Sequence, residues 1–599
     1  MIYLAAELLM GNNAIALGAI RAGVKFVSGY PGTPSTEILE TVAKRNPGDI
    51  HVEWSVNEKA ALEAAAGAAY AGARALVTMK QVGMNVASDP LMSLAYVGVK
   101  GGLVIACADD PGPISSQTEQ DTRTFAAFSK VPVFDPSSPE EAYEMIGDAF
   151  ELSEKYGCPV FIRPTTRVCH GCASIDVSDE IKDCKPEGFI KDTKRWVIFP
   201  NASYNNHIKL EKRRETLGEE LSDYKYNFIT GDGKMGIAAG GISWANAMEA
   251  VTAADIDCKM LKISTPYPFP ERLAVRFLEG LDKVLVLEEL DPVIEKELVF
   301  LCGKYGLSTK IFGKLTGDTP CAGELTVEAA KASIAKFTGV DIPVAAAKTD
   351  MPKLPMRPPV LCAGCPHRAS FYAVKQAMKG KKAVFSGDIG CYTLGNAMPL
   401  DMVDTCLCMG ADITIAQGIH WIEPDTVNFA FIGDSTFFAS GMTGVLNAVY
   451  NKCKIVIIVL DNSTTAMTGH QPHPGTGVTM MGENGTPADI PAVLRALGVG
   501  FVETVDPLDL KAAVDTVKRA ADFGEIAAVV FKSPCIAVTK TDASLKVDSD
   551  KCVGCSRCVN EIGCPALTIK DKKAVIEPSL CTGCTLCSQL CPCNAIGRC

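Results

Sequence analysis

Eight cysteines near the end of the chain constrain its fold more than any other feature of the sequence. Four of them have the spacing C-x2-C-x2-C-x3-C-P, which is typical of cysteines that hold [4Fe–4S] clusters. An earlier run of four differs only in having five residues before its fourth cysteine. Structural zinc would not require two such triplets, each followed by Cys-Pro, so the repeat predicts two clusters. The runs are Cys552, Cys555, Cys558 and Cys564, and then Cys581, Cys584, Cys587 and Cys591.

The spacing also predicts which cysteines share a cluster. In bacterial two-cluster ferredoxins, the fourth cysteine of each run binds the cluster of the other run. Cys591 should therefore join the first three cysteines of the earlier run, and Cys564 should join those of the later run. Elsewhere in the chain, Cys169 and Cys172 have metal-like spacing, but no second pair lies nearby in the sequence. We interpret that pair as incidental.

Length and charge exclude several classes of protein. A chain of 599 residues is too long for one hydrophobic core, and roughly three to five domains are expected. A net charge of −11, without a long basic run, argues against nucleic acid as a partner. No apolar stretch has the length of a membrane span, and the N-terminus lacks the basic region of a signal peptide. We expect a cytoplasmic protein without membrane contact, whose crowded cysteines ligate metal or iron–sulfur clusters.

Two short polar motifs lie at the ends of expected strands in the second half of the chain. The apolar runs 428–432 and 455–460 read as buried strands, with a turn at Gly433 and a helix over 440–450 between them. Asp434 and Asn462 should then lie at the carboxyl ends of two parallel strands, where open α/β sheets bind ligands. Their side-chain oxygens and the carbonyl of Thr464 would suit Mg²⁺ that also holds phosphate. The simpler alternative is a capping aspartate and a turn-forming Asp-Asn pair.

Other residues of the same region could contact a phosphate group. Gly469 belongs to a glycine-rich stretch whose backbone could approach a diphosphate closely. The region begins with Cys362-Ala363-Gly364-Cys365-Pro366-His367-Arg368. Its Cys-x2-Cys pair could be half of a zinc site, whereas His367 and Arg368 near a helix start suit a phosphate better. A further strand-end turn, at 387–391, contains Gly390.

The first part of the chain alternates strands and helices and predicts a doubly wound α/β domain. Strands are expected at 26–30, 52–56, 75–79, 103–108, 131–135 and 160–163. Ser35 can cap the helix after the first strand, and Gly67 permits close packing of an alanine-rich helix at 58–72. Glu58, at the start of that helix, is either a catalytic group or a first-turn carboxylate favoured by the helix dipole. Arg123 is either a surface cation or an anion clamp.

The remaining segments complete the expected domain order. Residues 176–231 are charged and read as a linker with one polar helix at 208–221. A smaller α/β domain follows, in which Ser243 caps a helix that reaches residue 253. The expected order is an α/β domain at 1–175, a linker at 176–231, a small α/β domain at 232–337, a Pro-rich linker at 338–360, a diphosphate- and Mg-binding α/β domain at 361–540 and a cluster domain at 541–599.

These motifs together resemble those of the 2-oxoacid:ferredoxin oxidoreductases, a family of thiamine diphosphate (TPP) enzymes. Gly433-Asp434-Ser435 with Asn462 resembles the diphosphate motif of TPP enzymes, although Ser435 replaces a glycine. Tyr30-Pro31-Gly32-Thr33-Pro34-Ser35 resembles the pyrimidine-domain loop, and Glu58, nine residues before Gly67, matches the catalytic glutamate. Domain order, length and residues 54–59 resemble the large (alpha) subunits of the indolepyruvate type. The resemblance spans the whole chain and is least specific over 176–345.

The resemblance implies the cofactors and the roles of individual residues. The cofactors are TPP, Mg²⁺ and two [4Fe–4S] clusters, held by two TPP-binding α/β domains and a two-cluster ferredoxin domain. Glu58 would bond the aminopyrimidine ring, and Thr33 and Arg123 would lie near the substrate carboxylate. The Mg²⁺ ligands would be Asp434, Asn462 and Thr464. The implied cofactor-binding residues are Pro31, Gly32, Gly364, Cys365, His367, Gly390, Gly433, Ser435 and Gly469.

The implied reaction is the oxidative decarboxylation of aryl 2-oxoacids, such as indolepyruvate and phenylpyruvate, to aryl-acetyl-CoA and CO₂. Electrons would pass through the clusters to ferredoxin. The implied partners are a small beta subunit, ferredoxin and coenzyme A, in a hetero-oligomer with two or more copies of this chain. Alternatives are a pyruvate, branched-chain or 2-oxoglutarate oxidoreductase, a non-oxidative TPP decarboxylase, and a non-catalytic electron-transfer subunit.

Overall fold

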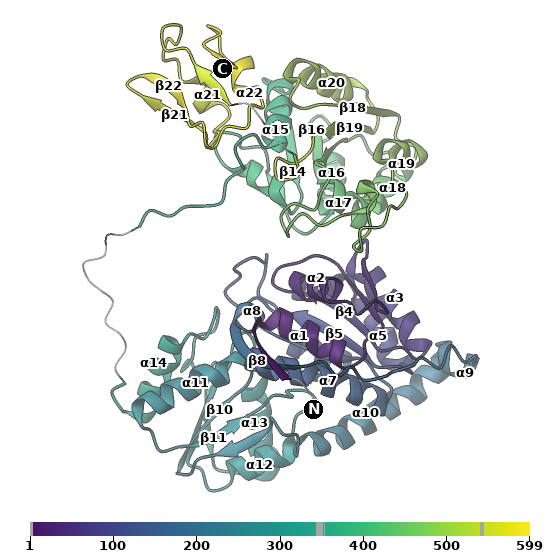
Figure 1. The fold of residues 1–599 in the computed structure, drawn as a ribbon, viewed down its shortest axis with the longest axis vertical. Helices are drawn as coiled ribbons and strands as arrows, with labels where there is room; N and C mark the ends of the chain where they lie inside the picture. The colour runs from purple at the N-terminus through teal and green to yellow at the C-terminus, as the bar shows by residue number, and fades with distance from the viewer. Residues whose placement is uncertain (1–3, 343–351, 353, 540–543, 599) are drawn as a thin grey trace. The chain divides into compact units, whose positions relative to one another are not determined.

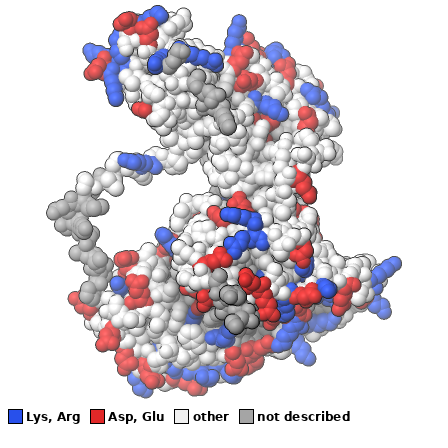
Figure 2. Space-filling view, viewed as in Figure 1, with Lys and Arg blue, Asp and Glu red and all other residues white. Residues whose placement is uncertain are grey.

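The computed structural model describes residues 4–342, 352, 354–539 and 544–598 (Figure 1). The chain divides into two compact units, residues 1–351 and 352–599. Of the predicted Pro-rich linker at 338–360, residues 343–351 and 353 lie outside the described residues. Within the described ranges, no helix has both the length and the apolar character needed to cross a membrane. On the face drawn in Figure 2, Lys and Arg are interspersed with Asp and Glu and form no continuous basic area.

The first unit is built on a parallel six-stranded sheet with strand order β3-β2-β4-β5-β7-β6. Its six strands confirm the predicted doubly wound domain, with ends that differ by a few residues. β5 is fully buried, as expected for a parallel strand covered on both faces. The strands are β2 (Phe26–Gly29), β3 (His51–Trp54), β4 (Ala75–Lys80), β5 (Leu103–Ala108), β6 (Val133–Phe134) and β7 (Val160–Ile162). The helices are α1 (Gly11–Arg21), α2 (Thr36–Lys44), α3 (Glu58–Tyr70), α4 (Gln81–Val86), α5 (Ser88–Val97), α6 (Thr122–Ser129), α7 (Pro139–Tyr156) and α8 (Thr166–His170).

A ribbon of two antiparallel strands, which the sequence did not predict, closes this domain. β1 (Leu4–Met10) pairs with β8 (Cys172–Ser178), so the domain reaches residue 178 rather than 175. The predicted linker at 176–231 is therefore wrong at its start. It is also wrong at its end, because β9 (Phe228–Thr230) joins the next sheet. Between them lie α9 (Thr193–Trp196) and α10 (Pro200–Leu221); the latter starts eight residues before the predicted helix and buries Leu210, Leu217 and Leu221.

The small domain of the first unit has a five-stranded sheet with strand order β13-β12-β10-β11-β9. The strands expected from its apolar runs, at 235–239, 260–263 and 284–287, form the centre of this sheet. Ser243 lies inside α11, which follows Gly240, so the predicted Ser243 cap is wrong. The strands are β10 (Met235–Ala239), β11 (Lys259–Lys262), β12 (Lys283–Leu287) and β13 (Lys310–Phe312). The helices are α11 (Gly241–Ala254), α12 (Glu271–Leu278), α13 (Val293–Tyr305) and α14 (Val327–Thr338).

The second unit contains a parallel six-stranded sheet with strand order β15-β14-β16-β17-β19-β18. β16 (Val427–Gly433) and β17 (Val456–Asp461) are direct neighbours, as the motifs at their ends required. The helix after β16 starts at Asp434, without a separate turn, as α17 (Asp434–Thr436), a π-helical η2 (Phe437–Gly441) and α18 (Met442–Tyr450). The other strands are β14 (Ala383–Gly387), β15 (Thr405–Cys406), β18 (Phe501–Val505) and β19 (Ala527–Lys532). The other helices are α15 (Pro366–Ala377), η1 (Cys391–Asn396), α16 (Ala411–Ile422), η3 (Pro474–Thr476), α19 (Ile490–Ala496) and α20 (Leu510–Asp522).

The C-terminal domain, residues 544–598, shares a hydrophobic core with this sheet domain. Leu545, Leu586 and Leu590 belong to the same buried cluster as Leu361 and Tyr372 near α15. Figure 1 shows the domain, in yellow, beside α15 and α20. The shared core holds the cysteine runs against the sheet domain. The elements are β20 (Leu545–Val547) with β23 (Ile596–Arg598), β21 (Leu567–Lys570) with β22 (Lys573–Ile576), α21 (Arg557–Asn560) and α22 (Leu586–Gln589).

Candidate active site and cluster cavities

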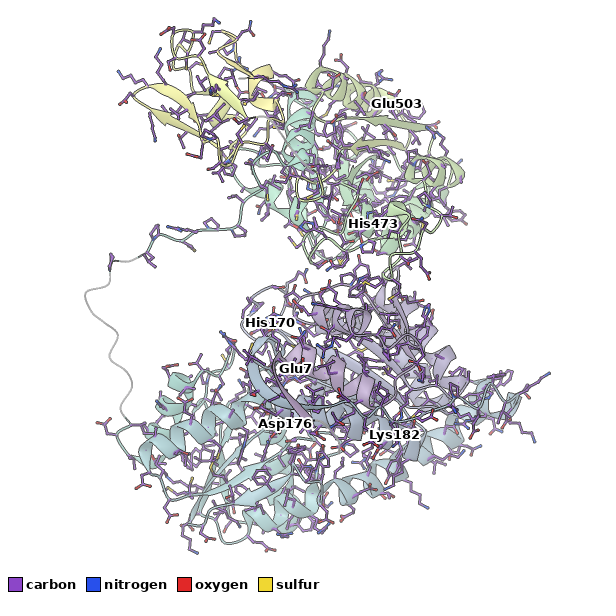
Figure 3. The ribbon with its side chains drawn as sticks, in the orientation of Figure 1. Glu7, His170, Asp176, Lys182, His473 and Glu503 are labelled. Carbon is purple, nitrogen blue, oxygen red and sulfur yellow. The ribbon has the colours of Figure 1, made fainter. Side chains whose placement is uncertain are left out.

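Asp434 is fixed at the end of β16 by the backbone of the neighbouring strand. One carboxylate oxygen, Oδ2, accepts hydrogen bonds from the backbone N–H groups of Asn462, at 3.1 Å, and Ser463, at 2.8 Å. The other oxygen accepts from the N–H of Ser435 at 2.8 Å. The Nε2 of His473, a residue labelled in Figure 3, lies 3.1 Å from Oδ2. The carboxylate is therefore held in one orientation at the carboxyl edge of the sheet.

The oxygen donors around Asp434 fit Mg²⁺. Asn462 and Thr464 are buried beside it, and Asn462 Oδ1 lies 3.2 Å from the backbone nitrogen of Thr464. A carboxylate, an amide oxygen and a backbone carbonyl are hard ligands of the kind that Mg²⁺ combines with phosphate oxygens. Because only one of these donors is an acidic side chain, the site differs from a cage of carboxylates and needs a phosphate to complete it.

The imidazole ring of His367 is buried in the same part of the sheet domain. It is 2% exposed, and within the described part of the chain neither ring nitrogen has a hydrogen-bond partner. Burial lowers the pKa of His367 to about 4, and the charge of Asp434 opposes that shift only partly. Leaving such a group unpaired costs free energy, and a bound phosphate would relieve that cost. The residues therefore fit a diphosphate cofactor held through Mg²⁺.

Glu58 is the first residue of α3 and follows β3. Its side chain is buried, and burial raises its pKa to about 7 although Lys80 acts in the opposite direction. A Cβ at Gly83 would lie 2.5 Å from Glu58 Oε1, so the glycine lets α4 approach the carboxyl group. A buried carboxyl that titrates near neutral pH is suited to exchanging a proton. This geometry favours a functional group over a surface carboxylate of the first helical turn.

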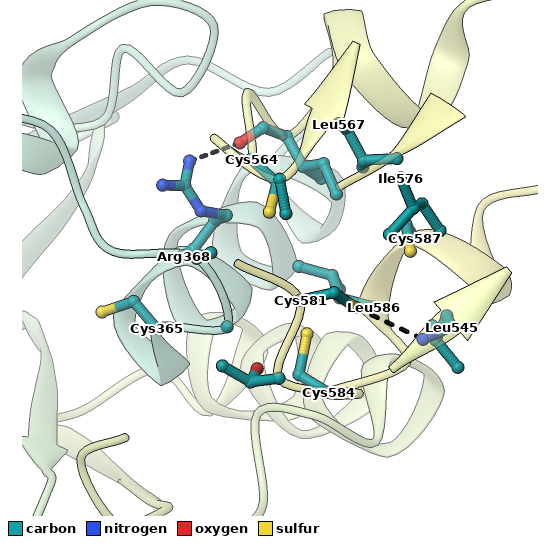
Figure 4. Close-up of a pocket in the computed structure, with 15 residues that line it drawn as sticks. Cys365, Arg368, Leu545, Cys564, Leu567, Ile576, Cys581, Cys584, Leu586 and Cys587 are labelled. Carbon is teal, nitrogen blue, oxygen red and sulfur yellow. Dashed lines mark hydrogen bonds between the residues drawn. The ribbon is translucent and has the colours of Figure 1, made fainter. Parts of the chain in front are cut away.

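Two separate cavities gather the cysteines of the C-terminal domain as the spacing predicts. No group of His, Cys, Asp or Glu side chains in the described ranges is tight enough for a single metal ion. A [4Fe–4S] cluster, which takes four cysteines around a larger body, suits these wider cavities. One cavity is lined by Cys552, Cys555, Cys558 and Cys591. The other, shown in Figure 4, is lined by Cys564, Cys581, Cys584 and Cys587.

Comparisons with known proteins assign families to three segments of the chain. Residues 17–194 match the family "Pyruvate flavodoxin/ferredoxin oxidoreductase, thiamine diP-bdg". Residues 388–531 match "Thiamine pyrophosphate enzyme, C-terminal TPP binding domain", and residues 544–592 match "4Fe-4S dicluster domain". The chain therefore combines TPP-binding domains with a cluster-binding domain.

Similar proteins extend over almost the whole chain. The indolepyruvate oxidoreductase subunit IorA of Methanothermobacter thermautotrophicus is 41% identical over 601 residues, covering 98% of this chain and 96% of that protein. The IorA of Thermococcus kodakarensis is 42% identical over 595 residues, covering 93% of this chain and 91% of that protein. This chain belongs to the IorA family. A 2-oxoglutarate synthase subunit KorA of M. thermautotrophicus is 29% identical and covers 47% of this chain and 86% of that protein.

In this IorA-family chain, Arg123 does not have the predicted position near a substrate. It is 1% exposed, and its Nη1 donates to Glu288 Oε2 at 3.0 Å. Nη2 donates to Asp121 Oδ2 at 2.7 Å and to the carbonyl of Glu289 at 2.7 Å, and Nε also donates to Asp121. Arg123 thus joins the first α/β domain to the small domain, with every guanidinium nitrogen in use. Both earlier interpretations, the anion clamp and the surface cation, are wrong.

Three residues at the start of the diphosphate domain, Gly364, Cys365 and Arg368, lie against the C-terminal domain. Arg368 donates to the carbonyls of Ile562 and Gly563, at 2.6 and 2.9 Å, and so holds the chain just before Cys564 (Figure 4). Its predicted phosphate contact is wrong because Nη1 binds these carbonyls and Nη2 binds the carbonyl of Leu361. A Cβ at Gly364 would lie 1.8 Å from Thr582 Oγ1, so Gly364 makes room for the C-terminal domain. Cys365 lines the second cluster cavity.

Several glycines have roles other than those predicted. Gly433 has φ −76°, so it makes no turn that requires glycine. A Cβ at Gly433 would lie 2.2 Å from Tyr392 Oη, and one at Gly390 would lie 2.5 Å from the Tyr392 ring. Both glycines therefore admit the Tyr392 side chain. Gly67 faces open space, so the predicted close packing of α3 at that residue is wrong.

Two buried aspartates were missed by the sequence reasoning. Asp388 follows β14, and its Oδ1 accepts from the N–H of Gly410 at 2.9 Å. Burial raises its pKa to about 6. Asp412 is completely buried, and neither of its oxygens has a partner among the described residues. The signal for Asp388 was present, because Gly387-Asp388 repeats the strand-end Gly-Asp of Gly433-Asp434.

Cys365, which lines the second cluster cavity, belongs to a set of four sheet-domain cysteines linked by electrostatic influence, the others being Cys362, Cys391 and Cys535. Burial raises the pKa of Cys391 to about 11, and the neighbouring thiols of Cys535 and Cys362 add to the shift. Burial also raises the pKa of Cys365 to about 12, with a contribution from Cys391. These four thiols come from separate parts of the sheet domain, and only Cys362 and Cys365 have paired spacing in the sequence. By contrast, Cys169 is buried and Cys172 exposed, in keeping with an incidental pair.

Proposed function

We propose that this chain, together with a small beta subunit, oxidatively decarboxylates aryl 2-oxoacids of the indolepyruvate type to acyl-CoA and CO₂. The observation that carries the proposal is the shared core of the diphosphate domain and the cluster domain. One-electron acceptors packed beside a TPP domain serve an oxidative reaction, and a simple decarboxylase has no use for them. Names of relatives that cover nearly the whole chain supply the substrate class.

The residues of this chain have separate tasks in that reaction. Bound TPP supplies the carbon nucleophile and the electron sink for decarboxylation. Asp434, Asn462 and the carbonyl of Thr464 would hold the Mg²⁺ of its diphosphate, and His367 would contact a phosphate oxygen. Ser435 and Gly469 would line the same cradle. Glu58 would exchange a proton with the aminopyrimidine ring, a task for which its pKa of about 7 is suitable.

Electrons leave through the cysteine cavities of the second unit. We assign one cluster to each of the two cavities of the C-terminal domain. We also propose a third cluster, held by Cys362, Cys365, Cys391 and Cys535, because Cys362 and Cys535 lie close enough to act on the Cys391 thiol, and Cys391 close enough to act on the Cys365 thiol. Cys365 also lines the cavity of Cys564, Cys581, Cys584 and Cys587, so the third cluster would adjoin the second.

The partners of the chain follow from the same reaction. We propose a small beta subunit, coenzyme A and a soluble ferredoxin as partners, in an assembly with two or more copies of this chain. A cytoplasmic location stays a prediction. Pyruvate, branched-chain 2-oxoacids and 2-oxoglutarate are the competing substrates.

An anaerobic assay of the chain with its beta subunit tests the function. We expect reduction of a viologen dye that depends on coenzyme A, with indolepyruvate or phenylpyruvate preferred over pyruvate and 2-oxoglutarate by kcat/KM. Aldehyde release without dye reduction would instead support a non-oxidative decarboxylase. Absence of turnover and of bound TPP would support a subunit that only transfers electrons.

Iron analysis of anaerobically purified protein tests the cluster assignments. We expect about twelve iron atoms and as many acid-labile sulfides per chain, since each [4Fe–4S] cluster contains four of each. Cys587→Ala should remove about four iron atoms, and Cys391→Ala should remove a different set of about four. A wild-type content near eight, unchanged in Cys391→Ala, would limit the chain to the two C-terminal clusters.

A further inference from the structure

Lys80 lies at the carboxyl end of β4, next to the buried Glu58. Its charge acts on the Glu58 carboxyl, and a Cβ at Gly32 would lie 3.1 Å from Lys80 Cγ. Gly32 belongs to the loop before α2, in which its N–H donates to Thr36 Oγ1 at 3.0 Å. Lys80 therefore contacts this loop and lies within electrostatic range of the carboxyl group to which we assign the proton exchange.

Among the described residues, the ammonium group of Lys80 donates hydrogen bonds only to neutral oxygen atoms. Its Nζ lies 3.2 Å from the carbonyl of Ser115 and 3.4 Å from Ser116 Oγ. No carboxylate of the described residues comes within 4.0 Å of it, although Glu58 and Asp110 are near enough to influence its titration. Burial lowers the pKa of Lys80 despite these two carboxylates. A partly desolvated cation without a close anion is unfavourable, and a bound anion would relieve that cost.

The segment with Ser115 and Ser116, which contacts Lys80, also contacts the loop with Thr33. Ser115 Oγ lies 3.5 Å from the carbonyl of Thr33, and Ser115 N–H donates to Asp110 Oδ2 at 2.8 Å. The segment with Ser115 and Ser116 and the loop with Thr33 thus meet beside Lys80. A lysine with a serine hydroxyl beside it, at the carboxyl edge of a parallel sheet, has the composition of an anion-binding site.

We propose that Lys80 binds the carboxylate of the 2-oxoacid substrate. This inference rests on the proposed function and replaces Arg123 as the substrate cation. Arg123 cannot serve, because its guanidinium nitrogens all bind Asp121, Glu288 and the carbonyl of Glu289 within the first unit. Lys80 has its charge available, and it lies beside Glu58 and the Thr33 loop. Thr33, Ser115 and Ser116 would complete the site with hydroxyl contacts.

Equilibrium binding to the complete TPP- and Mg²⁺-loaded enzyme tests this role without turnover. The probes are phenyllactate, an unreactive 2-hydroxy acid, and its carboxamide, which lacks the negative charge. We expect wild type to prefer the acid. Lys80→Met should reduce that preference on the order of 10- to 100-fold, the range for a hydrogen bond to a charged group. Lys80→Arg should retain most of it, because it keeps the charge.

A matched control separates this role from a general effect of charge. Lys59 follows Glu58 directly, but it is exposed and paired with Glu63. Lys59→Met should leave the preference for the acid unchanged. If Lys80→Met fails to fold, Lys80→Gln, which also removes the charge, takes its place. The measured quantity is the ratio of the affinities for acid and amide, which does not depend on the amount of active protein. An acid-to-amide ratio that is the same in wild type and in the Lys80 variant overturns the proposal.

Two further measurements distinguish this proposal from its premise. With 2-oxoacid substrate, Lys80→Met should raise KM more than it lowers kcat, and the Glu58-linked midpoint of the pH profile should move upward because a nearby positive charge is lost. A lower kcat with unchanged KM would make Lys80 a partner of Glu58 only and overturn its role toward substrate. If wild type binds the acid through Lys80 but turns over no 2-oxoacid, the proposed function fails and the carboxylate site stands.

Discussion

Glu58→Gln is expected to lower turnover of 2-oxoacid by ~10²- to 10⁴-fold, the range typical of a lost acid–base group. Glutamine keeps the shape of the side chain and most of its hydrogen bonds, but it cannot exchange a proton. The buried carboxyl, with its pKa near 7, is the group that can do so at this position. The measurement is anaerobic dye reduction at saturating coenzyme A, with hydrogen–deuterium exchange at the thiazolium carbon of bound TPP as a second readout.

The control for Glu58 comes from the same helix. Glu63 is exposed on α3 and pairs with Lys59, so Glu63→Gln should leave the rate unchanged. TPP content and iron content should be the same in both variants. A Glu58→Gln enzyme with a near wild-type rate would reduce Glu58 to a carboxylate of the first helical turn.

The same substitution should raise stability above neutral pH. The pKa of Glu58 rises from 4.5 to about 7 on folding, so the folded chain binds more protons than the unfolded chain between these values. The free energy of unfolding therefore falls as pH increases through that window, by about 3 kcal/mol in all. Gln does not ionise, so Glu58→Gln should melt at a higher temperature than wild type at pH 8 and not at pH 4, when both lack TPP. A gain in stability with a loss of rate is the mark of a residue kept for function.

Asp434→Ala is expected to abolish retention of TPP. The Asp434 carboxylate supplies the charged ligand among the oxygen donors at the β16 and β17 ends, and Mg²⁺ would bridge these donors to the diphosphate. EDTA should release TPP from wild type in the same way. The measurement is TPP content after gel filtration, with iron content to show that the second unit remains intact.

A conservative variant and a distant one complete that experiment. Asp434→Asn keeps acceptor oxygen for the N–H groups of Asn462 and Ser463 but removes the charge, so it should also lose TPP. Asp425 is exposed in the turn before β16, and Asp425→Ala should retain TPP fully. Full retention by both Asp434 variants would contradict the metal assignment and move the diphosphate elsewhere in the domain.

Local sequence patterns determined most of the architecture. Apolar runs predicted the six strands of the first parallel sheet, the three central strands of the small domain and the two strands that precede Asp434 and Asn462, since a buried parallel strand needs a continuous run. The spacing of the cysteines gave the two cavities with their crossed fourth ligands, because a short loop can place its thiols in only a few ways. Asp434 and Asn462 could be placed together because adjacent parallel strands end at the same edge of a sheet.

Contacts between residues far apart in the chain were decided only by the tertiary structure. Arg123 looked free in the sequence, yet Glu288, 165 residues away, takes up its charge. Gly83 owes its importance to Glu58, and Gly433 to Tyr392, although no local pattern marks either pair. Packing also decides how far the pKa of Glu58 is raised by burial, and it decides which groups lie beside Lys80. Periodicity and spacing specify the elements of this protein, whereas the partner of each charged group follows from how those elements meet.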